Sequence, residues 1–151
     1  SETPPHLPNC VTLCMIPVWT RGLTMADSDS RIEMVTQVLD AMNKHNPVAA
    51  ARNFTETCVL DSHRGPYPHG QRFSGKSAVE GAFRSFFNRV PDAVIADPEI
   101  LAVDERVFVL AKMTGRSMTG ERLNQNICEI YEFDDDQISR LDTYWKRPDR
   151  H

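Results

Sequence analysis

The feature that most constrains the fold is the order of two hydrophobic periods along the chain, helical first and strand-like afterwards. Apolar residues recur at helical spacing over residues 30–44, where Ser30 and Glu33 also match a capping box. A short second helix is predicted over residues 46–54, and a third over residues 77–89. Helices followed by consecutive strands are the order expected of an α+β domain with helices on one face of a sheet.

The strand-like part of the chain begins before the third helix and resumes after Pro91. Short polar turns separate the strands that we predict, which cover residues 57–63, 93–96, 99–103, 106–116, 121–133 and 138–146. Residues 64–74 contain two glycines and two prolines and predict a loop. The strands after Pro91 are joined by turns of hairpin length, so we expect their pairing to be antiparallel.

Length and composition limit the chain to one ordinary globular domain. Its 151 residues fit a single core, and 40% hydrophobic with 25% charged residues is typical of folded proteins. Residues 1–24 hold four prolines and show no helical or strand period, so we expect an N-terminal arm or extension there. Met25-Ala26-Asp27 looks like an initiator sequence. A single domain is therefore expected over residues 25–151.

Charge and cysteine content exclude several function classes. The net charge is −4, with 17 basic residues scattered among 21 acidic ones, which argues against nucleic acid and favours a neutral, apolar or cationic partner. No apolar run reaches the length of a membrane span. The four cysteines form no CxxC pair, so we expect no structural zinc site, and a reducing, cytoplasmic location is the default.

Three segments of the chain carry a resemblance to a known family. They are Val38-Leu-Asp-Ala-Met-Asn-Lys-His-Asn-Pro-Val-Ala-Ala-Ala-Arg-Asn-Phe54, Phe73-Ser-Gly-Lys-Ser-Ala-Val-Glu-Gly-Ala-Phe83 and Ile130-Tyr-Glu-Phe-Asp-Asp-Asp-Gln-Ile-Ser-Arg-Leu-Asp-Thr-Tyr-Trp145. Together with the element order, they resemble the nuclear transport factor 2-like superfamily, which includes ketosteroid isomerases and SnoaL-like polyketide cyclases. The resemblance spans about residues 30–146.

This resemblance implies a conical half-barrel with cystatin-like topology, in which a strongly bent antiparallel sheet wraps around three N-terminal helices. It also implies a deep, mostly apolar pocket and a homodimer formed through the outer face of the sheet. Because such folds host enzymes and non-enzymes alike, the function has to be argued from the pocket residues.

The resemblance assigns pocket positions that can be compared with the isomerase mechanism. It places Val38 where the family has an oxyanion-hole tyrosine, Ser62 where it has the base, and Glu129 where it has a second oxyanion donor. Valine donates no hydrogen bond, so the familiar steroid isomerase mechanism is not expected. Thr143 stands where epoxide hydrolases of this fold have an aspartate, and Trp145 where the isomerases have a pocket tryptophan.

The candidate catalytic residues are Glu129, Asp61 and His63. Glu129 in an apolar pocket would lose hydration, which raises the pKa of a carboxyl group and suits it to proton transfer. Asp61 and His63 lie two apart, so they would share a face of a regular strand and form a carboxylate-oriented imidazole base. A solvated, polar loop is the alternative for this pair. The substrate-binding candidates are Val38, Met42, Tyr67, Ile127 and Trp145.

Two functions remain open at this point. The first is a small-molecule enzyme that performs isomerase, cyclase or lyase chemistry by general acid–base catalysis on a hydrophobic carbonyl compound, such as a polyketide-like or steroid-like molecule. We expect this acid–base chemistry to need neither a metal nor an organic cofactor. The second is a non-catalytic ligand-binding or dimerisation module of the same fold. Turnover of a bound ligand would separate them.

Overall fold

The computed structural model describes residues 25–149, so the arm expected over residues 1–24 lies outside the described residues. Within these described residues, three helices and six strands follow one another. They are α2 (Met25–Asn43), α3 (Pro47–Ala51), β1 (Phe54–Asp61), β2 (Arg72–Ser74), α4 (Lys76–Arg89), β3 (Val94–Val103), β4 (Arg106–Arg116), β5 (Arg122–Asp134) and β6 (Gln137–Trp145). None of the helices in residues 25–149 is long and apolar enough to cross a membrane.

The two first helices differ from the prediction at their ends. Ser30 lies inside α2, which is already helical at Met25, so the predicted capping box is wrong. Asp27 in the first turn places a negative charge near the positive end of the helix dipole, which favours the earlier start. The start of α3 is as predicted, because the side chain of Asn46 accepts a hydrogen bond from the Ala49 amide at 3.1 Å.

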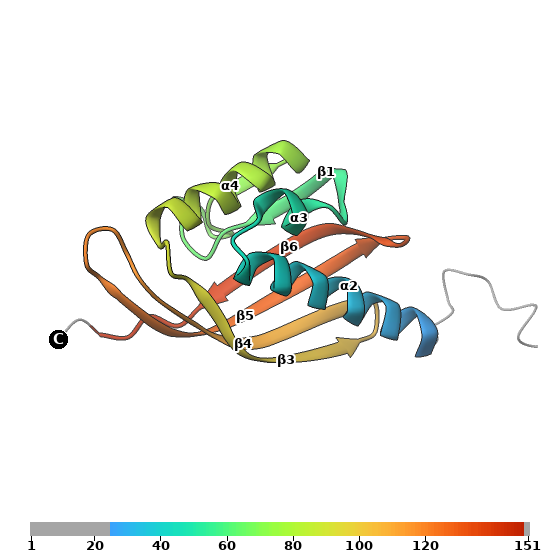
Figure 1. The fold of residues 1–151 in the computed structure, drawn as a ribbon. Helices are drawn as coiled ribbons and strands as arrows, with labels where there is room; N and C mark the ends of the chain where they lie inside the picture. The colour runs from blue at the N-terminus through green and yellow to red at the C-terminus, as the bar shows by residue number, and fades with distance from the viewer. Residues whose placement is uncertain (1–24, 150–151) are drawn as a thin grey trace, which may run out of the picture.

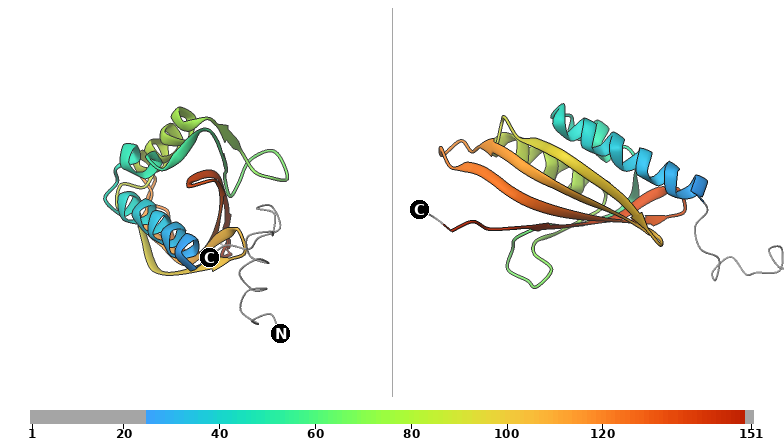
Figure 2. Two further views of the ribbon diagram at one scale, coloured as in Figure 1. Left: turned by 90° about the vertical axis from the view of Figure 1, so that its right-hand side faces the viewer. Right: turned by 90° about the horizontal axis from the view of Figure 1, so that it is seen from below.

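The six strands form one bent sheet in the order β2-β1-β6-β5-β4-β3. The sheet curls around the helices without closing, as both views in Figure 2 show, and the helices cover one face (Figure 1). The expected α+β half-barrel is therefore confirmed. Strands β3 to β6 pair antiparallel, but β1 pairs parallel with β6. The long connection through α4 and four strands allows this parallel pairing, which local sequence patterns do not reveal.

Two segments differ from the strand prediction. Residues 94–103 form one strand rather than two, because a bulge between Ala96 and Glu99 absorbs the irregular residues and Asp97 adopts φ 51° there. The predicted loop at residues 64–74 contains the short strand β2. The turn before β2 needs Gly70, where φ is 81° and a Cβ atom would lie 1.9 Å from the Ser62 carbonyl oxygen.

The hydrophobic core fills the space between α2 and the inner face of the sheet. Alternate residues of the central strands point into it, including Val107, Val109 and Tyr131, all at most 1% exposed. Val38 from α2 belongs to this core. Side chains do not fill the space between α4 and the nearer halves of β5 and β6. The candidate site lies in this space.

Candidate functional site

A cavity of about 370 Å³ lies between α4 and the inner face of the sheet. Its walls are largely apolar and come from elements far apart in the sequence. Among the lining residues are Met42 from α2, Leu60 from β1, Phe83 and Phe86 from α4, Ile127 from β5 and Trp145 from β6. Concave apolar sites with a few polar groups are typical of small-molecule binding.

Glu129 is the buried carboxyl group in this wall. It is only 7% exposed, and its Oε1 atom has no hydrogen-bond partner among the described residues. Across the neighbouring strands it faces Val109 on β4 and Thr143 on β6. Loss of hydration raises the pKa of Glu129 from 4.5 to about 7, although a hydrogen bond from the Tyr131 hydroxyl acts in the opposite direction.

The alternation of β5 explains this placement. Ile127, Glu129 and Tyr131 are buried on the inner face, whereas Cys128 and Ile130 between them point outward and are only half-buried. The sequence-based placement of Glu129 and Ile127 on the pocket face agrees with the structure. At a pKa near 7, this carboxyl group exists in both protonation states at neutral pH and can therefore accept or donate a proton.

His63 lies at the mouth of the cavity against Trp145. The two rings are stacked with centroids 3.8 Å apart and an angle of 2° between their planes. Phe86 packs edge-on against Trp145, with ring centroids 5.9 Å apart and an angle of 82° between the ring planes. Burial, assisted by Arg64, Arg147 and Arg89, lowers the pKa of His63 from 6.5 to about 4, so the imidazole is neutral at pH 7.

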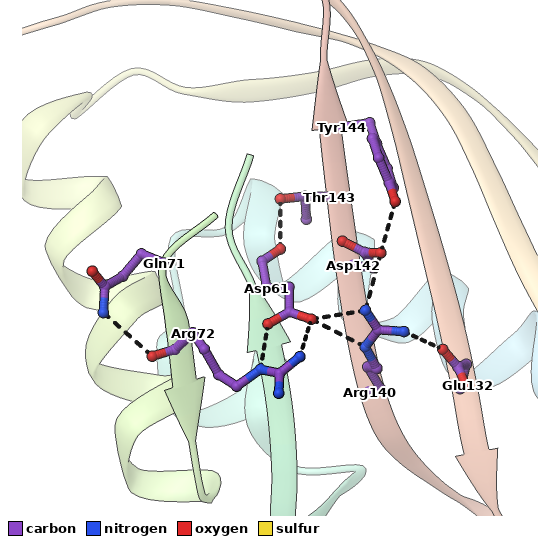
Figure 3. A network of polar contacts seen from close by, with 8 residues as sticks. All are labelled: Asp61, Gln71, Arg72, Glu132, Arg140, Asp142, Thr143 and Tyr144. Atoms are coloured by element: carbon purple, nitrogen blue, oxygen red, sulfur yellow. Dashed lines mark hydrogen bonds and ion pairs between the residues drawn. The ribbon is translucent and has the colours of Figure 1, made fainter. Parts of the chain in front are cut away.

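Asp61 lies outside this cavity, in an ionic cluster on the outer face of the sheet (Figure 3). Its side chain is fully buried and binds Arg72 at 2.7 and 2.9 Å and Arg140 at 2.8 Å. Arg72 above all, with Arg140, lowers the pKa of Asp61 from 3.8 to about 2. Arg140 extends the cluster to Glu132 and Asp142.

The expectation that Asp61 and His63 share a strand face is therefore wrong. Strand β1 ends at Asp61, so the alternation of side chains stops there and does not extend to His63. Leu60 and Ser62, on either side of Asp61, both line the cavity. His63 lines the cavity as well and stacks on Trp145, whereas Asp61 binds Arg72 and Arg140. The position implied by the resemblance for a base, Ser62, carries only a hydroxyl group.

The five substrate-binding candidates divide into two groups. Met42, Ile127 and Trp145 line the cavity, but Val38 and Tyr67 do not. Val38 is enclosed in the core, so it has no surface left for a ligand. Tyr67 is 60% exposed and stacks on His69 at 5.4 Å. Residues 62–71 fold into a hairpin of their own, which projects from the body in Figure 2 and carries Tyr67 away.

Sequence reasoning missed the contribution of α4. Of the two adjacent phenylalanines on this helix, Phe87 belongs to the core, whereas Phe86 forms part of the cavity wall. Gly81 on the same helix also lines the cavity, and a Cβ atom there would meet nothing within 4 Å. A glycine inside a helix with no packing reason is a signal that could have identified this open side.

The described residues offer no ready metal site. Within residues 25–149, no three histidine, cysteine, aspartate or glutamate side chains are grouped so that they could hold a metal ion. The polar side chains that line the cavity are those of Ser62, His63, Gln71, Ser85, Glu129 and Thr143, together with Arg64 and Arg89. This donor set suits hydrogen bonding and proton transfer.

The fold is shared with several solved structures. A candidate polyketide cyclase from Xanthomonas campestris matches with a TM-score of 0.71 and 18% identity, over 80% of this chain and 93% of that chain. A candidate isomerase from Bacillus subtilis matches with a TM-score of 0.69 and 18% identity, over 80% and 88%. A cystatin-fold protein from Novosphingobium aromaticivorans matches with a TM-score of 0.63 and 19% identity, over 77% and 97%. At these identities, the matches show the fold alone.

Sequence comparison identifies the family. No curated protein matches the chain significantly. The family description of the SnoaL-like domain, however, matches residues 35–141, which is more than half of the chain. This range includes the C-terminal half of α2, the complete strands β1 to β5, the first part of β6 and the carboxyl group of Glu129. The chain therefore belongs to the SnoaL-like domain family.

Proposed function

We propose that the protein is a small-molecule enzyme that performs general acid–base chemistry on a hydrophobic carbonyl compound, with Glu129 as the group that moves the proton. The reaction would be of the isomerase, cyclase or lyase type, on a polyketide-like or steroid-like molecule. The observation that carries this proposal is the buried, unpartnered Oε1 atom of Glu129 in the wall of an apolar cavity. A polar atom left without a partner in such a place costs free energy, which a ligand group can recover.

The proposed step is a proton transfer beside the carbonyl group. The ionised carboxylate of Glu129 takes a proton from the carbon next to the carbonyl, and the resulting acid returns that proton to a different atom of the same molecule. A base with a pKa near the working pH is suited to both halves of this exchange. The neutral imidazole of His63 is in the same cavity and can orient the carbonyl oxygen.

Hydrogen–deuterium exchange tests this proposal directly. Aromatic and steroid-like ketones are incubated with the protein in D₂O, and exchange of the protons next to the carbonyl is followed by NMR. We expect exchange whose rate rises with a midpoint near pH 7, and at least about a 100-fold loss in Glu129→Gln. Glu99→Gln, which changes an exposed carboxyl group on β3, is the matched control and should leave the rate unchanged.

The same experiment has two outcomes that contradict the proposal. Exchange that survives in Glu129→Gln would remove Glu129 from the mechanism. Ligands that bind in the cavity but exchange no proton in the wild-type protein would indicate the non-catalytic binding module instead. Binding is measured separately by the shift of ligand NMR signals, so that an absent ligand is not mistaken for an absent reaction.

We propose that the protein is a homodimer formed through the outer face of the sheet. Leu101, Leu110 and Tyr144 are exposed there, and Leu110 and Tyr144 both flank the outward-facing Cys128 in the strand register. A second copy would bury this apolar row. Sedimentation should give a dimer that Leu110→Glu dissociates, whereas Val48→Glu, at an exposed position on α3, does not.

A monomeric wild-type protein would contradict the dimer.

We also propose that the protein works in the reducing cytoplasm. The thiols of Cys58 and Cys128, the two cysteines among residues 25–149, are both free.

A further inference from the structure

A second cavity, of about 540 Å³, adjoins the mouth of the first. The two cavities lie side by side, because they share part of their lining. The residues that line both are His63, Arg64, Ser85, Phe86, Arg89 and Trp145. The stacked rings of His63 and Trp145 thus lie at the boundary between the apolar cavity and the second one.

The second cavity is strongly basic. Arg64 from the loop after β1, Arg89 from the end of α4 and Arg147 from the segment after β6 all line it. Glu121 is the one carboxylate among its lining residues. Within the described part of the chain, no ion pair occupies any of these three guanidinium groups, although Arg89 lies over the Phe86 ring at 6.0 Å.

Two arginines on the outer face of the sheet differ from these three because they form ion pairs. Arg72 and Arg140 pair with Asp61 at 2.7 and 2.8 Å, and Arg140 also pairs with Glu132 and Asp142. The three cavity arginines come from separate parts of the chain, yet all three act on the imidazole of His63 and lower its pKa. Their positive charges therefore converge on one place at the mouth of the apolar cavity.

A second unpartnered polar atom lies in the same region. Gln125 lines the second cavity, and its buried Oε1 atom has no hydrogen-bond partner among the residues that the structure describes. A buried amide oxygen without a donor costs free energy in the same way as the Oε1 atom of Glu129. Each cavity therefore contains one buried acceptor that a ligand can satisfy.

We infer that the protein binds amphipathic ligands whose anionic group lies among Arg64, Arg89 and Arg147, while the apolar, carbonyl-bearing part extends towards Glu129. The guanidinium group presents a planar fork of donors that fits carboxylate and phosphate oxygens. A hydroxyl or amide group next to the anion would donate to Gln125. The position of the carbonyl rests on the proposed function, but the anionic site does not.

The local charge overrides the prediction from net charge. A chain of net charge −4 favours a neutral or cationic partner when its charges are evenly spread. At physiological salt, however, exposed charges act over only about 8 Å, so the groups that line a cavity decide its preference. Three arginines against one carboxylate make this cavity attractive to anions.

Two matched fluorescent probes test the inference with the full chain. 8-Anilinonaphthalene-1-sulfonate and N-phenyl-1-naphthylamine have the same aromatic body, but only the first carries a charge. We expect the sulfonate to bind more tightly, and Arg89→Gln or the pair Arg64→Gln with Arg147→Gln to weaken it about 3- to 10-fold without affecting the neutral probe. Arg106→Gln, which removes an exposed arginine on β4 outside both cavities, is the control.

Competition identifies the anion. Octanoate, octyl phosphate and octanol share one alkyl chain, and we expect one or both anions to displace the neutral probe at lower concentration than octanol. This advantage should shrink in the arginine variants and as salt rises in the wild-type protein, a measurement that does not depend on any variant folding. Equal displacement by all three, or an advantage that ignores both salt and the arginine variants, would overturn the inference. Glu129→Gln should retain the anion preference, so a failed catalytic test leaves this result intact.

Discussion

The burial of Glu129 has a cost that can be measured as stability. In the unfolded chain this carboxyl group ionises near pH 4.5, but in the folded protein it keeps its proton up to about pH 7. Between these two values the folded state holds more protons than the unfolded state, so stability decreases as pH rises. Glu129→Gln removes the ionisable group while keeping the shape of the side chain, so the variant should not show this loss.

The magnitude follows from the difference between the two pKa values. A change from 4.5 to about 7 corresponds to about 3 kcal/mol in the free energy of unfolding. We therefore expect Glu129→Gln and the wild-type protein to differ little near pH 4.5. Above pH 7 the variant should become more stable by up to about 3 kcal/mol, while losing the proposed activity.

Urea unfolding at several pH values, followed by circular dichroism, provides the assay. The quantity of interest is the difference between variant and wild-type free energies of unfolding, in which the titration of all other groups cancels. Glu99→Gln, at an exposed position on β3, should give a difference that does not depend on pH. If the difference for Glu129→Gln also stayed flat between pH 5 and pH 8, the carboxyl group would not be held protonated, and the reasoning would be refuted.

Three further changes test the surroundings of the site. Asp61→Asn should lower the free energy of unfolding by about 3 kcal/mol, because it leaves Arg72 and Arg140 without their buried charged partner. Urea unfolding should show this loss of stability shrinking as pH falls from about 4 towards 2, because wild-type Asp61 itself becomes protonated there. Gly81→Ala should raise the free energy of unfolding by about 0.5–1 kcal/mol, since the added methyl group meets nothing within 4 Å; an unchanged or lower melting temperature would contradict this. Gly70→Ala should destabilise the loop hairpin and weaken binding of the anionic probe, because φ is 81° and the added Cβ would collide with backbone; unchanged probe affinity would contradict this.

The fold could be predicted from sequence as far as local patterns reach. On β5 the alternation is regular, so Ile127 and Glu129 were placed on the correct face. The parallel pairing of β1 with β6 was not accessible, because it joins Leu60 to Leu141 across the whole domain and leaves no local signature. The same holds for Asp61, whose environment depends on Arg140 from that distant strand.

The site was predictable only in part for a related reason. A single strand gives the direction of Glu129, but a cavity exists only where several elements fail to fill the space between them. The basic cavity combines Arg64, Arg89 and Arg147, which lie 25 or more residues apart and follow no common period. Net charge averages over all charged groups of the chain. It therefore favoured a neutral, apolar or cationic partner, whereas the arginines of this cavity favour an anion.

The sheet contains two buried carboxyl groups whose pKa values are shifted in opposite directions by their neighbours. Asp61 and Glu129 are both less than a tenth exposed, so burial alone does not distinguish them. Two guanidinium groups keep Asp61 ionised, whereas the apolar cavity favours the protonated form of Glu129. The two are connected through Thr143, which faces Glu129 in the strand register and donates a hydrogen bond to the main-chain oxygen of Asp61 at 3.2 Å. The permanently charged cluster on the outer face thus holds β1 against β6 (Figure 3), and this fixes one wall around the carboxyl group whose charge changes near neutral pH.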